Sequence, residues 1–335
     1  MSSQKGIMRV SMVLVALSMV LVLAAGFVNA APDKLVFKLG HPLAVTHPRH
    51  LACQRFADLV KERTKGRVEI VVYPAGQLGD EIELGEAVQM GTIDFAEIGG
   101  PIFTNWVPQY AVFGLPFLFD SYQEAYKALD GPMGKKMEKL AEAKGFFILS
   151  HWDHGFRHIT NNVRPIEKPS DLKGLKMRTP EEFVNIETFK ALGCGVTPLP
   201  FGELYLALQQ KVVDGQENPL GNIYYSKLYE VQKYLSLTSH IYANSILVTS
   251  LNTWKRIPKD IQEIMLQAAD EAKGYMRELI QKDDEKLLKE LKDKGMIINR
   301  PDTAPFREAV KGVYKNLEGR IGKDIIQEML RELGK

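Results

Sequence analysis

The segment 259–294 places the strongest constraint on the fold of this chain, because its apolar spacing is helical throughout and is interrupted by no proline and by one glycine, Gly274. A helix of roughly 36 residues, rising about 1.5 Å per residue, spans about 54 Å. One globular domain is narrower than that length. We therefore expect this helix to lie along two domains and to brace them.

Strands and helices alternate along the remaining sequence. Segments with the apolar pattern of strands are 34–39, 67–73, 93–98, 146–150, 157–160, 175–177 and 240–250. Segments with helical spacing are 47–65, 81–90, 122–129, 133–144, 182–192 and 201–211, followed by one or two helices after residue 304. Such alternation is typical of an α/β fold with a largely parallel sheet. Because no low-complexity linker separates two domains, we expect strands to cross between them more than once.

The first thirty residues have the pattern of a cleaved secretory signal. Lys5 and Arg9 precede an apolar run over residues 10–25, and the tripeptide ending at Ala30 supplies the site that a signal peptidase reads. The alternative is a membrane anchor, but the apolar run is short for a bilayer span of about 20 residues. No cysteine stands at the cleavage point, which disfavours a lipoprotein. We therefore expect cleavage after Ala30 and a protein that works in the periplasm.

Charge and length limit the classes of partner and the number of domains. Without residues 1–30 the count of basic residues falls from 43 to 41, which equals the count of acidic residues. A net charge near zero gives no reason to expect nucleic acid or an anionic membrane as a partner. Residues 31–335 are long for one hydrophobic core, so two domains are the natural division.

The sequence carries none of the compact motifs that would mark an enzyme. It contains no Gly-x-Ser-x-Gly elbow, no phosphate-binding glycine loop and no zinc-protease helix motif. A nucleophilic cysteine would need a base and an orienting partner, and the sequence identifies neither for Cys53 or Cys194. An exported pair could form a disulfide, but positions in a helical segment and at a turn favour two separate thiols. We expect no enzymatic activity and no cofactor.

Six of the seven histidines fall in two clusters, at His41, His47 and His50 and at His151, His154 and His158. Three or four converging ligands of this kind could capture a metal ion. His154 and His158 would lie close enough together to share a metal ion only on a helix, however, and Gly155 with the β-branched residues after it favours a strand. The simpler interpretation is that these histidines cap turns or form hydrogen bonds beside a cleft.

Two segments in the second half carry side chains suited to a carboxylate ligand. Arg178 ends a short apolar strand and is followed by Pro180, so its side chain would project at the sheet edge, where open α/β sheets bind ligands. A guanidinium pairs with a carboxylate through two parallel hydrogen bonds. Asn218 lies in a polar loop after Gly215 and can both donate and accept hydrogen bonds. From the residues alone, a structural arginine paired to a nearby acid and a plain turn are the simpler interpretations.

The same two segments also carry a family resemblance. GFR at 155–157, LKGLKMR at 172–178, FGELYLALQQ at 201–210 and VDGQENP at 213–219 resemble the periplasmic solute-binding proteins of tripartite ATP-independent (TRAP) transporters, the dicarboxylate-binding (DctP-type) family. Further matches are YPAGQLG at 73–79 and VFGLPFLF at 112–119. The resemblance covers nearly all of the sequence after residue 30, with its motifs in order along the chain.

The resemblance implies an α/β fold of the two-lobed periplasmic-binding-protein type. Its ligand cleft lies between the lobes, and crossing strands and a long helix span both. We expect lobe I to comprise residues 31–153 and about 243–282, and lobe II to comprise residues 154–242 and about 283–335. By position in the motifs, the family arginine that pairs with the ligand carboxylate corresponds to Arg178, a second family arginine to Arg157, and the family asparagine to Asn218.

The resemblance leaves the bound acid open, because family members bind dicarboxylates, sialic acid, uronates, aldonates and keto acids. The expected cleft wall is rich in hydrogen-bonding side chains, namely His47, Glu81, Glu97, Trp152, His154 and Glu217. Such a wall suits hydroxyl groups, so a sugar acid is favoured over a C4-dicarboxylate, another monocarboxylate or, more distantly, a metal ion. The implied partners are the organic acid and the TRAP permease subunits, and we expect a monomer.

Overall fold

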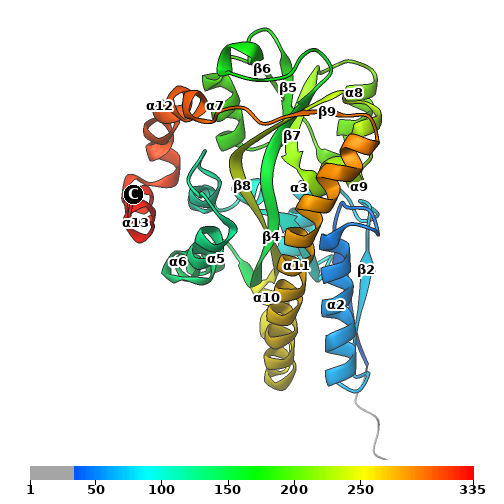
Figure 1. Cartoon of the computed structure of the whole chain (residues 1–335). Coiled ribbons are helices and arrows are strands. Elements are labelled where there is room, and N and C mark those ends of the chain that lie inside the picture. Colours follow the sequence, from blue (N-terminus) through cyan, green and yellow to red (C-terminus); the bar gives the residue numbers. More distant parts are fainter. Residues whose placement is uncertain (1–33) are drawn as a thin grey trace, which may run out of the picture. The chain divides into compact units, whose positions relative to one another are not determined.

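Two long antiparallel strands, β4 (Phe146–Asn161) and β8 (Tyr234–Ser250), form the centre of the sheet in the computed structural model (Figure 1). The structure describes residues 34–335, and the sheet and its helices belong to the unit Val36–Lys335. The predicted signal peptide lies outside the described residues.

Both central strands are longer than the sequence predicts, since the predicted strands stop at 146–150, 157–160 and 240–250. The strands continue through polar residues whose side chains are buried and hydrogen-bonded. Asp153, for example, is fully buried and accepts hydrogen bonds from two tyrosine hydroxyls. Because a buried polar residue does not produce the apolar pattern on which strand prediction depends, the pattern divides β4 into two strands.

The described residues form a nine-stranded sheet in the order β2-β1-β3-β8-β4-β7-β5-β6, with β9 paired to β8. The shorter strands are β1 (Leu35–Gly40), β2 (Val68–Tyr73), β3 (Phe95–Gly99), β5 (Lys176–Thr179), β6 (Gly195–Pro198), β7 (Gly215–Pro219) and β9 (Ile297–Asn299). Parallel pairs join β1 to β3 and join β5 to β6 and β7, while β3 and β7 run antiparallel to the long strands. The sheet is therefore mixed, where the sequence predicts a largely parallel one.

Strands β3 and β7 attach at opposite ends of the long pair. β3 pairs with β8 between Ser245 and Thr249, whereas β7 pairs with β4 between Arg157 and Asn161. The part of β4 just before Arg157 therefore lies between the two groups of short strands. Gly155, in this part, has a φ of +104° beside an irregularity in the pairing. That conformation favours glycine and bends the strand.

The helix α11 (Lys259–Asp293) has 35 residues and confirms the long helix predicted over 259–294. It packs against α2 (Pro48–Arg63) and β4 and also contacts α9 (Leu220–Tyr225). A hydrogen bond of 3.2 Å from Trp152 Nε1 to the carbonyl oxygen of Ala269 ties β4 to this helix. In the sequence α2 follows β1 and α9 follows β7. The long helix therefore contacts an element next to each group of short strands and braces the two groups.

The remaining helices are α3 (Glu81–Met90), α4 (Gly100–Phe103), α5 (Tyr122–Asp130), α6 (Pro132–Glu142), α7 (Phe183–Ala191), α8 (Leu204–Gln209), α10 (Leu251–Arg256), α12 (Ala304–Ile321) and α13 (Lys323–Glu332). The two C-terminal helices, α12 and α13, contact segments that are far apart in the sequence. α12 packs on α7, while Arg307 forms an ion pair with Asp120 at 2.6 Å. Within residues 34–335, none of the helices is long and apolar enough to cross a membrane.

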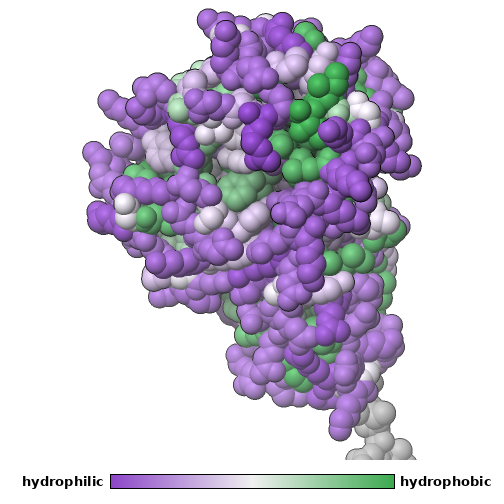
Figure 2. Space-filling view, in the orientation of Figure 1, coloured by the Kyte–Doolittle hydropathy of each residue, from purple (hydrophilic) through white to green (hydrophobic). Residues whose placement is uncertain are grey.

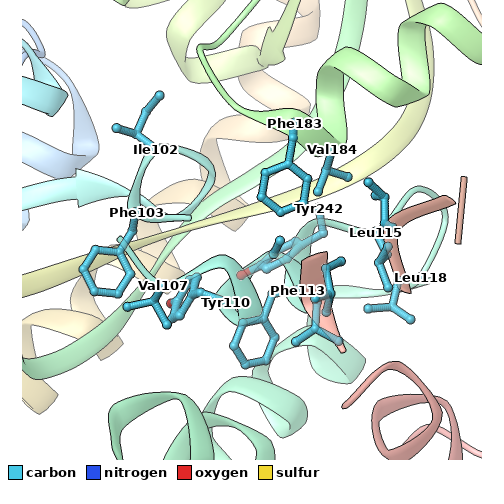
Figure 3. Packing of buried hydrophobic residues seen from close by; sticks show 14 of the residues in the cluster. Ile102, Phe103, Val107, Tyr110, Phe113, Leu115, Leu118, Phe183, Val184 and Tyr242 are labelled. Atoms are coloured by element: carbon cyan, nitrogen blue, oxygen red, sulfur yellow. The ribbon is translucent and has the colours of Figure 1, made fainter. Parts of the chain in front are cut away.

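The largest apolar cluster packs aromatic side chains against β8 (Figure 3). Phe103 of α4 meets Tyr110 edge-to-face at a ring distance of 5.3 Å, and Tyr110 meets Phe113 in a similar way at 5.2 Å. Phe183 of α7 and Tyr242 of β8 belong to the same cluster. Each such buried side chain stabilises the fold by about 1.5–3 kcal/mol relative to an exposed one, so this cluster fixes α4 and α7 on the central strands.

The surface in the view of Figure 2 is mostly hydrophilic, with apolar side chains in small patches.

Cys53 is buried in α2, Cys194 is partly buried, and both thiols are free, as the sequence predicts. Burial raises the pKa of Cys53 well above its ordinary value and the pKa of Cys194 to about 12. Neither thiol is therefore activated as a nucleophile.

Candidate functional site

A cavity of about 30 Å³ lies where β4, β5 and β7 meet the first turns of α2, α3 and α9. Its polar lining consists of Arg49, Glu81, His154, Arg157, Arg178, Asn218 and Asn222. Leu43, Ile102, Phe201 and three prolines supply the apolar part of the wall. A concave site with a few convergent polar groups on an apolar wall is the usual form of a small-molecule site.

Arg178 projects into this cavity from β5 with only 2% of its surface exposed. Its Nε and one terminal nitrogen donate to the carbonyl oxygen of Leu199, at 2.9 and 2.5 Å. No carboxylate of residues 34–335 forms an ion pair with it, although the charges of Glu217, Glu81 and Glu181 offset part of the effect of burial. Burial, together with the neighbouring charge of Arg157, lowers the pKa of Arg178 to about 10. Arg178 therefore remains a cation at neutral pH without a counter-ion from this part of the chain.

Arg157, on β4, has a matched counter-ion. It grips Glu217 through two hydrogen bonds, from Nε at 2.5 Å and from NH2 at 2.8 Å. Burial raises the pKa of the Glu217 carboxyl, but the charge of Arg157 and hydrogen bonds from Arg157 and His240 outweigh burial and bring the pKa down to about 2. The pair is thus neutral as a whole, and Glu217 fixes the position of Arg157.

Arg49, in the first turn of α2, has two counter-ions. Its Nε donates to Glu97 at 2.6 Å, and its NH2 donates to Glu81 at 3.2 Å. The same oxygen of Glu81 accepts the backbone N–H of Gly99 at 2.8 Å, while the other carboxylate oxygen of Glu81 accepts no hydrogen bond from residues 34–335. The part of the wall formed by α2 and α3 therefore presents one available acceptor, on Glu81, and one cation, Arg49, whose charge is balanced by two carboxylates.

A network of amides and imidazoles closes the cavity beside α9. Asn222 Oδ1 lies 3.0 Å from Nε2 of His47 and 3.0 Å from Nε2 of His154. Asn222 Nδ2 donates to Asn218 Oδ1 at 2.9 Å. Burial, followed by the charge of Arg49, lowers the pKa of both histidines well below the ordinary value. Both rings are therefore neutral at physiological pH.

The structure brings five of the eight predicted site residues to the cavity wall, namely Glu81, His154, Arg157, Arg178 and Asn218. His47 and Glu217 lie one layer behind the wall, where His47 contacts Asn222 and Glu217 contacts Arg157. Their effect on a ligand would pass through those partners.

Trp152 is the predicted site residue that the structure does not bring to the cavity. Its side chain is fully buried and its Nε1 donates to the carbonyl oxygen of Ala269 in α11. The pairing of β4 with β8 is irregular between Asp153 and Gly155. Such an irregularity re-aims the side chains on either side of it, so Trp152 and His154 face different elements although they are two residues apart.

The sequence does not single out Arg49, Asn222 or Phe201 as wall residues. Arg49 carries one usable signal, because a cation in the first turn of a helix is disfavoured by the helix dipole and therefore needs another reason to be there. Asn222 follows the VDGQENP motif closely, but its position on the wall depends on the turn from β7 into α9. Phe201 gives no signal that distinguishes it from a core aromatic residue.

A second pocket, of about 260 Å³, adjoins the cavity and shares Glu81, Arg178 and Phe201 with it. Its remaining wall includes the loop around Gly76 and the acidic residues Asp80, Glu83 and Glu181. Arg178 therefore lies at the junction of the two spaces.

The two histidine clusters do not converge on one point. His41 and His50 contact each other at 3.0 Å, and His47 and His154 meet at Asn222. Over residues 34–335 there is no group of three or more histidine, cysteine or acidic side chains that could hold a metal ion.

The sequence profile of one family, described as bacterial extracellular solute-binding protein, family 7, matches residues 39–320 of the chain. Among its relatives is the 2,3-diketo-L-gulonate-binding periplasmic protein of Escherichia coli (strain K12). That protein is 34% identical over 294 residues, which cover 88% of this chain and 90% of the relative.

Solved structures of similar proteins contain different acids. A TRAP periplasmic solute-binding protein from Polaromonas sp. JS666, bound to D-erythronate, is 35% identical with a TM-score of 0.86 over 88% of this chain and 98% of its own. One from Sulfurospirillum deleyianum DSM 6946, with bound succinate, is also 35% identical, with a TM-score of 0.85 over 89% of this chain and 98% of its own.

Proposed function

The chain belongs to the bacterial extracellular solute-binding proteins of family 7, and on this basis we propose that it captures a small organic acid in the periplasm by pairing Arg178 with the ligand carboxylate. Members of this family are substrate-binding proteins of transport systems. The acid would then be delivered to the membrane permease subunits of a TRAP transporter, and the chain itself would perform no chemistry on it.

The observation that carries this proposal is the uncompensated charge of Arg178. A buried cation without a counter-ion is unfavourable, and an anion that enters the cavity would remove that cost. The NH1 groups of Arg178 and Arg157 donate to no acceptor among residues 34–335, so both are available to an incoming carboxylate. Since the two cations repel each other across the cavity, a carboxylate near both would be held strongly.

We propose a hydroxylated monocarboxylate, a sugar acid such as an aldonate or a uronate, as the ligand. The other two cavity arginines are already matched, Arg157 by Glu217 and Arg49 by Glu81 and Glu97. One uncompensated cation suits one carboxylate. A second ligand carboxylate would meet Glu81 rather than a free cation, and like charges at close range repel.

A C4-dicarboxylate or another monocarboxylate is the second candidate, because the relative that binds succinate is as similar to this chain as the relative that binds D-erythronate. Sequence identity therefore does not choose between the two ligand classes. The distribution of charge in the cavity favours the hydroxylated acid.

Export and assembly complete the proposal. Cleavage after Ala30 would release a soluble periplasmic protein, and intact-mass measurement of the exported protein should give an N-terminus at Ala31. A product that retains Met1 and sediments with membranes would contradict cleavage. We also propose that the protein is a monomer, which sedimentation analysis of the exported form tests directly.

Titration calorimetry with a small panel of ligands tests the binding proposal. D-Erythronate and D-galactonate should bind and raise the melting temperature, because a ligand that binds only the folded state stabilises it. Erythritol, which keeps hydroxyls but has no carboxylate, should not bind, and succinate should bind more weakly than the two sugar acids. The absence of binding by every acid, or binding of erythritol as tight as that of D-erythronate, would refute the proposal.

A further inference from the structure

One buried polar atom of the cavity wall is left without a partner by the described part of the chain. His154 lines the cavity with 8% of its surface exposed, and its Nδ1 forms no hydrogen bond with residues 34–335. Buried nitrogen atoms of this kind are nearly always paired in folded proteins. The atom therefore points to a group that is supplied from outside the described part of the chain.

The ring nitrogen of His154 that carries the proton follows from a series of hydrogen bonds that starts at a group that can only donate. Arg157 NH2, which can only donate, lies 3.3 Å from Asn218 Oδ1, so that atom is an acceptor. The Asn222 atom that faces it at 2.9 Å must then be the amide nitrogen. The other end of Asn222 is consequently its oxygen, and the His154 Nε2 that faces this oxygen at 3.0 Å must carry a proton.

His47 confirms this orientation of Asn222 independently. Its Nε2 faces the same oxygen, which again requires a proton on Nε2 and a bare Nδ1. The Nδ1 of His47 does accept the backbone N–H of Arg49 at 3.1 Å, as a bare nitrogen should. Arg49 NH1 lies 3.4 Å from His154 Nε2, but both groups carry protons there, so this contact is not a hydrogen bond.

His154 Nδ1 is therefore a bare acceptor on a side chain that lines the cavity, and it stays bare because burial and the nearby arginines hold the pKa of the ring well below its ordinary value. A carboxylate has no proton to donate to it. A ligand ammonium group would be repelled by the cations at positions 49, 157 and 178. The group that fits is a neutral hydroxyl.

We propose that His154 selects hydroxylated acids by accepting a hydrogen bond at Nδ1 from a ligand hydroxyl, while the open oxygen of Glu81 accepts one from a second hydroxyl. This inference rests on the proposed function, since it assigns the end of the ligand away from Arg178. Acids of equal length without hydroxyls leave both acceptors unpaired. A buried acceptor without a partner lowers the binding free energy by the full cost of its desolvation.

The test compares D-erythronate with butanoate, which has the same four-carbon chain and carboxylate but no hydroxyl. His154→Phe keeps a planar ring and removes the acceptor, so affinity for D-erythronate should fall about tenfold or more while affinity for butanoate stays within about twofold. His154→Gln, which can keep a donor toward Asn222 and turn its oxygen to the ligand, should retain part of the preference.

His158→Phe is the matched control. His158 lies on the same strand, is 7% exposed and does not line the cavity, so it should leave both affinities unchanged even if the melting temperature falls. Equal losses for the two acids in His154→Phe, or no loss for D-erythronate, would overturn the proposal.

A spectroscopic measurement on the ligand-free protein gives an independent result. Nitrogen-15 NMR of histidine-labelled protein should show His154 protonated at Nε2 and bare at Nδ1, and D-erythronate should shift the Nδ1 signal as it gains a hydrogen bond. A proton on Nδ1 would overturn the assignment. If no acid binds to the parent protein, the proposed function fails instead, and the tautomer measurement still stands on its own.

Discussion

At the scale of single residues, the three cavity arginines differ in what balances their charge. The motifs predict Arg157 and Arg178 in the site, but they cannot show that Arg157 is matched by Glu217, 60 residues away, while Arg178 is not matched. That difference depends on the pairing of β4 with β7. The motifs therefore locate the cations. Only the pairing of the strands in the folded protein shows which cation is available to a ligand.

A substitution at His158 tests how burial controls titration. Burial, with the charges of His240 and Arg300, lowers the pKa of His158 to about 3, whereas in the unfolded chain it is near 6.5. Below pH 6.5 the unfolded chain therefore binds a proton that the folded protein does not bind. Stability is lost as pH falls, by about 2 kcal/mol between pH 7 and pH 5. Urea unfolding of His158→Asn should show an acid loss smaller by this amount; parallel profiles would contradict the assignment.

At the scale of elements, helices with regular apolar spacing are predicted well from the sequence and strands with buried polar residues are not. The long helix is predicted within one residue of its observed end at Asp293. By contrast, β4 continues through residues 151–156, where histidine and aspartate side chains find partners that are distant in sequence. Periodicity reports burial of apolar groups, so it cannot identify a strand whose buried face is polar.

Two glycines in helices, Gly274 in α11 and Gly134 in α6, give a matched pair of predictions. A Cβ added to Gly274, in the middle of α11, would have no neighbour within 4 Å, so Gly274→Ala should raise the free energy of unfolding by about 0.5–1 kcal/mol. A Cβ added to Gly134 in α6 would lie 1.8 Å from the carbonyl oxygen of Leu129, so Gly134→Ala should destabilise the protein. Denaturant unfolding of both variants checks the pair, and a loss of stability in Gly274→Ala would show that α11 is strained there.

At the scale of the whole molecule, two strands and one helix connect the groups of short strands on either side of the cavity. β8 pairs with β3, β4 pairs with β7, and the two long strands pair with each other, while α11 contacts both α2 and α9. The lobe boundaries predicted from the sequence, near residues 153 and 242, remain predictions; β3 pairs with β8 over residues 245–249, and β7 pairs with β4 over residues 157–161. We propose that the lobes move about these three connections, and that α12 and α13, which contact both sides, move with one of them.

Ligand binding should favour the closed arrangement of the lobes, because Arg178 and Glu81 reach the cavity from opposite sides and only a closed cleft lets one ligand contact both. Small-angle X-ray scattering should therefore show a smaller radius of gyration with saturating D-erythronate than without it. Superimposable curves in the two conditions would count against hinge closure.

Titration of an organic acid into Arg178→Ala tests the central claim most directly. Removing one partner of a buried charge pair costs about 3–5 kcal/mol, so affinity for D-erythronate should fall by about two to three decades or more. Arg178→Lys should fail nearly as badly, because an ammonium group cannot reproduce the bidentate contact. Both variants should remain folded. In Arg178→Ala the unpaired carbonyl oxygen of Leu199 lowers stability, while removal of a buried cation without a counter-ion raises it, so the two effects oppose each other. An Arg178→Ala protein that is folded and binds within a few-fold of the parent would contradict the account.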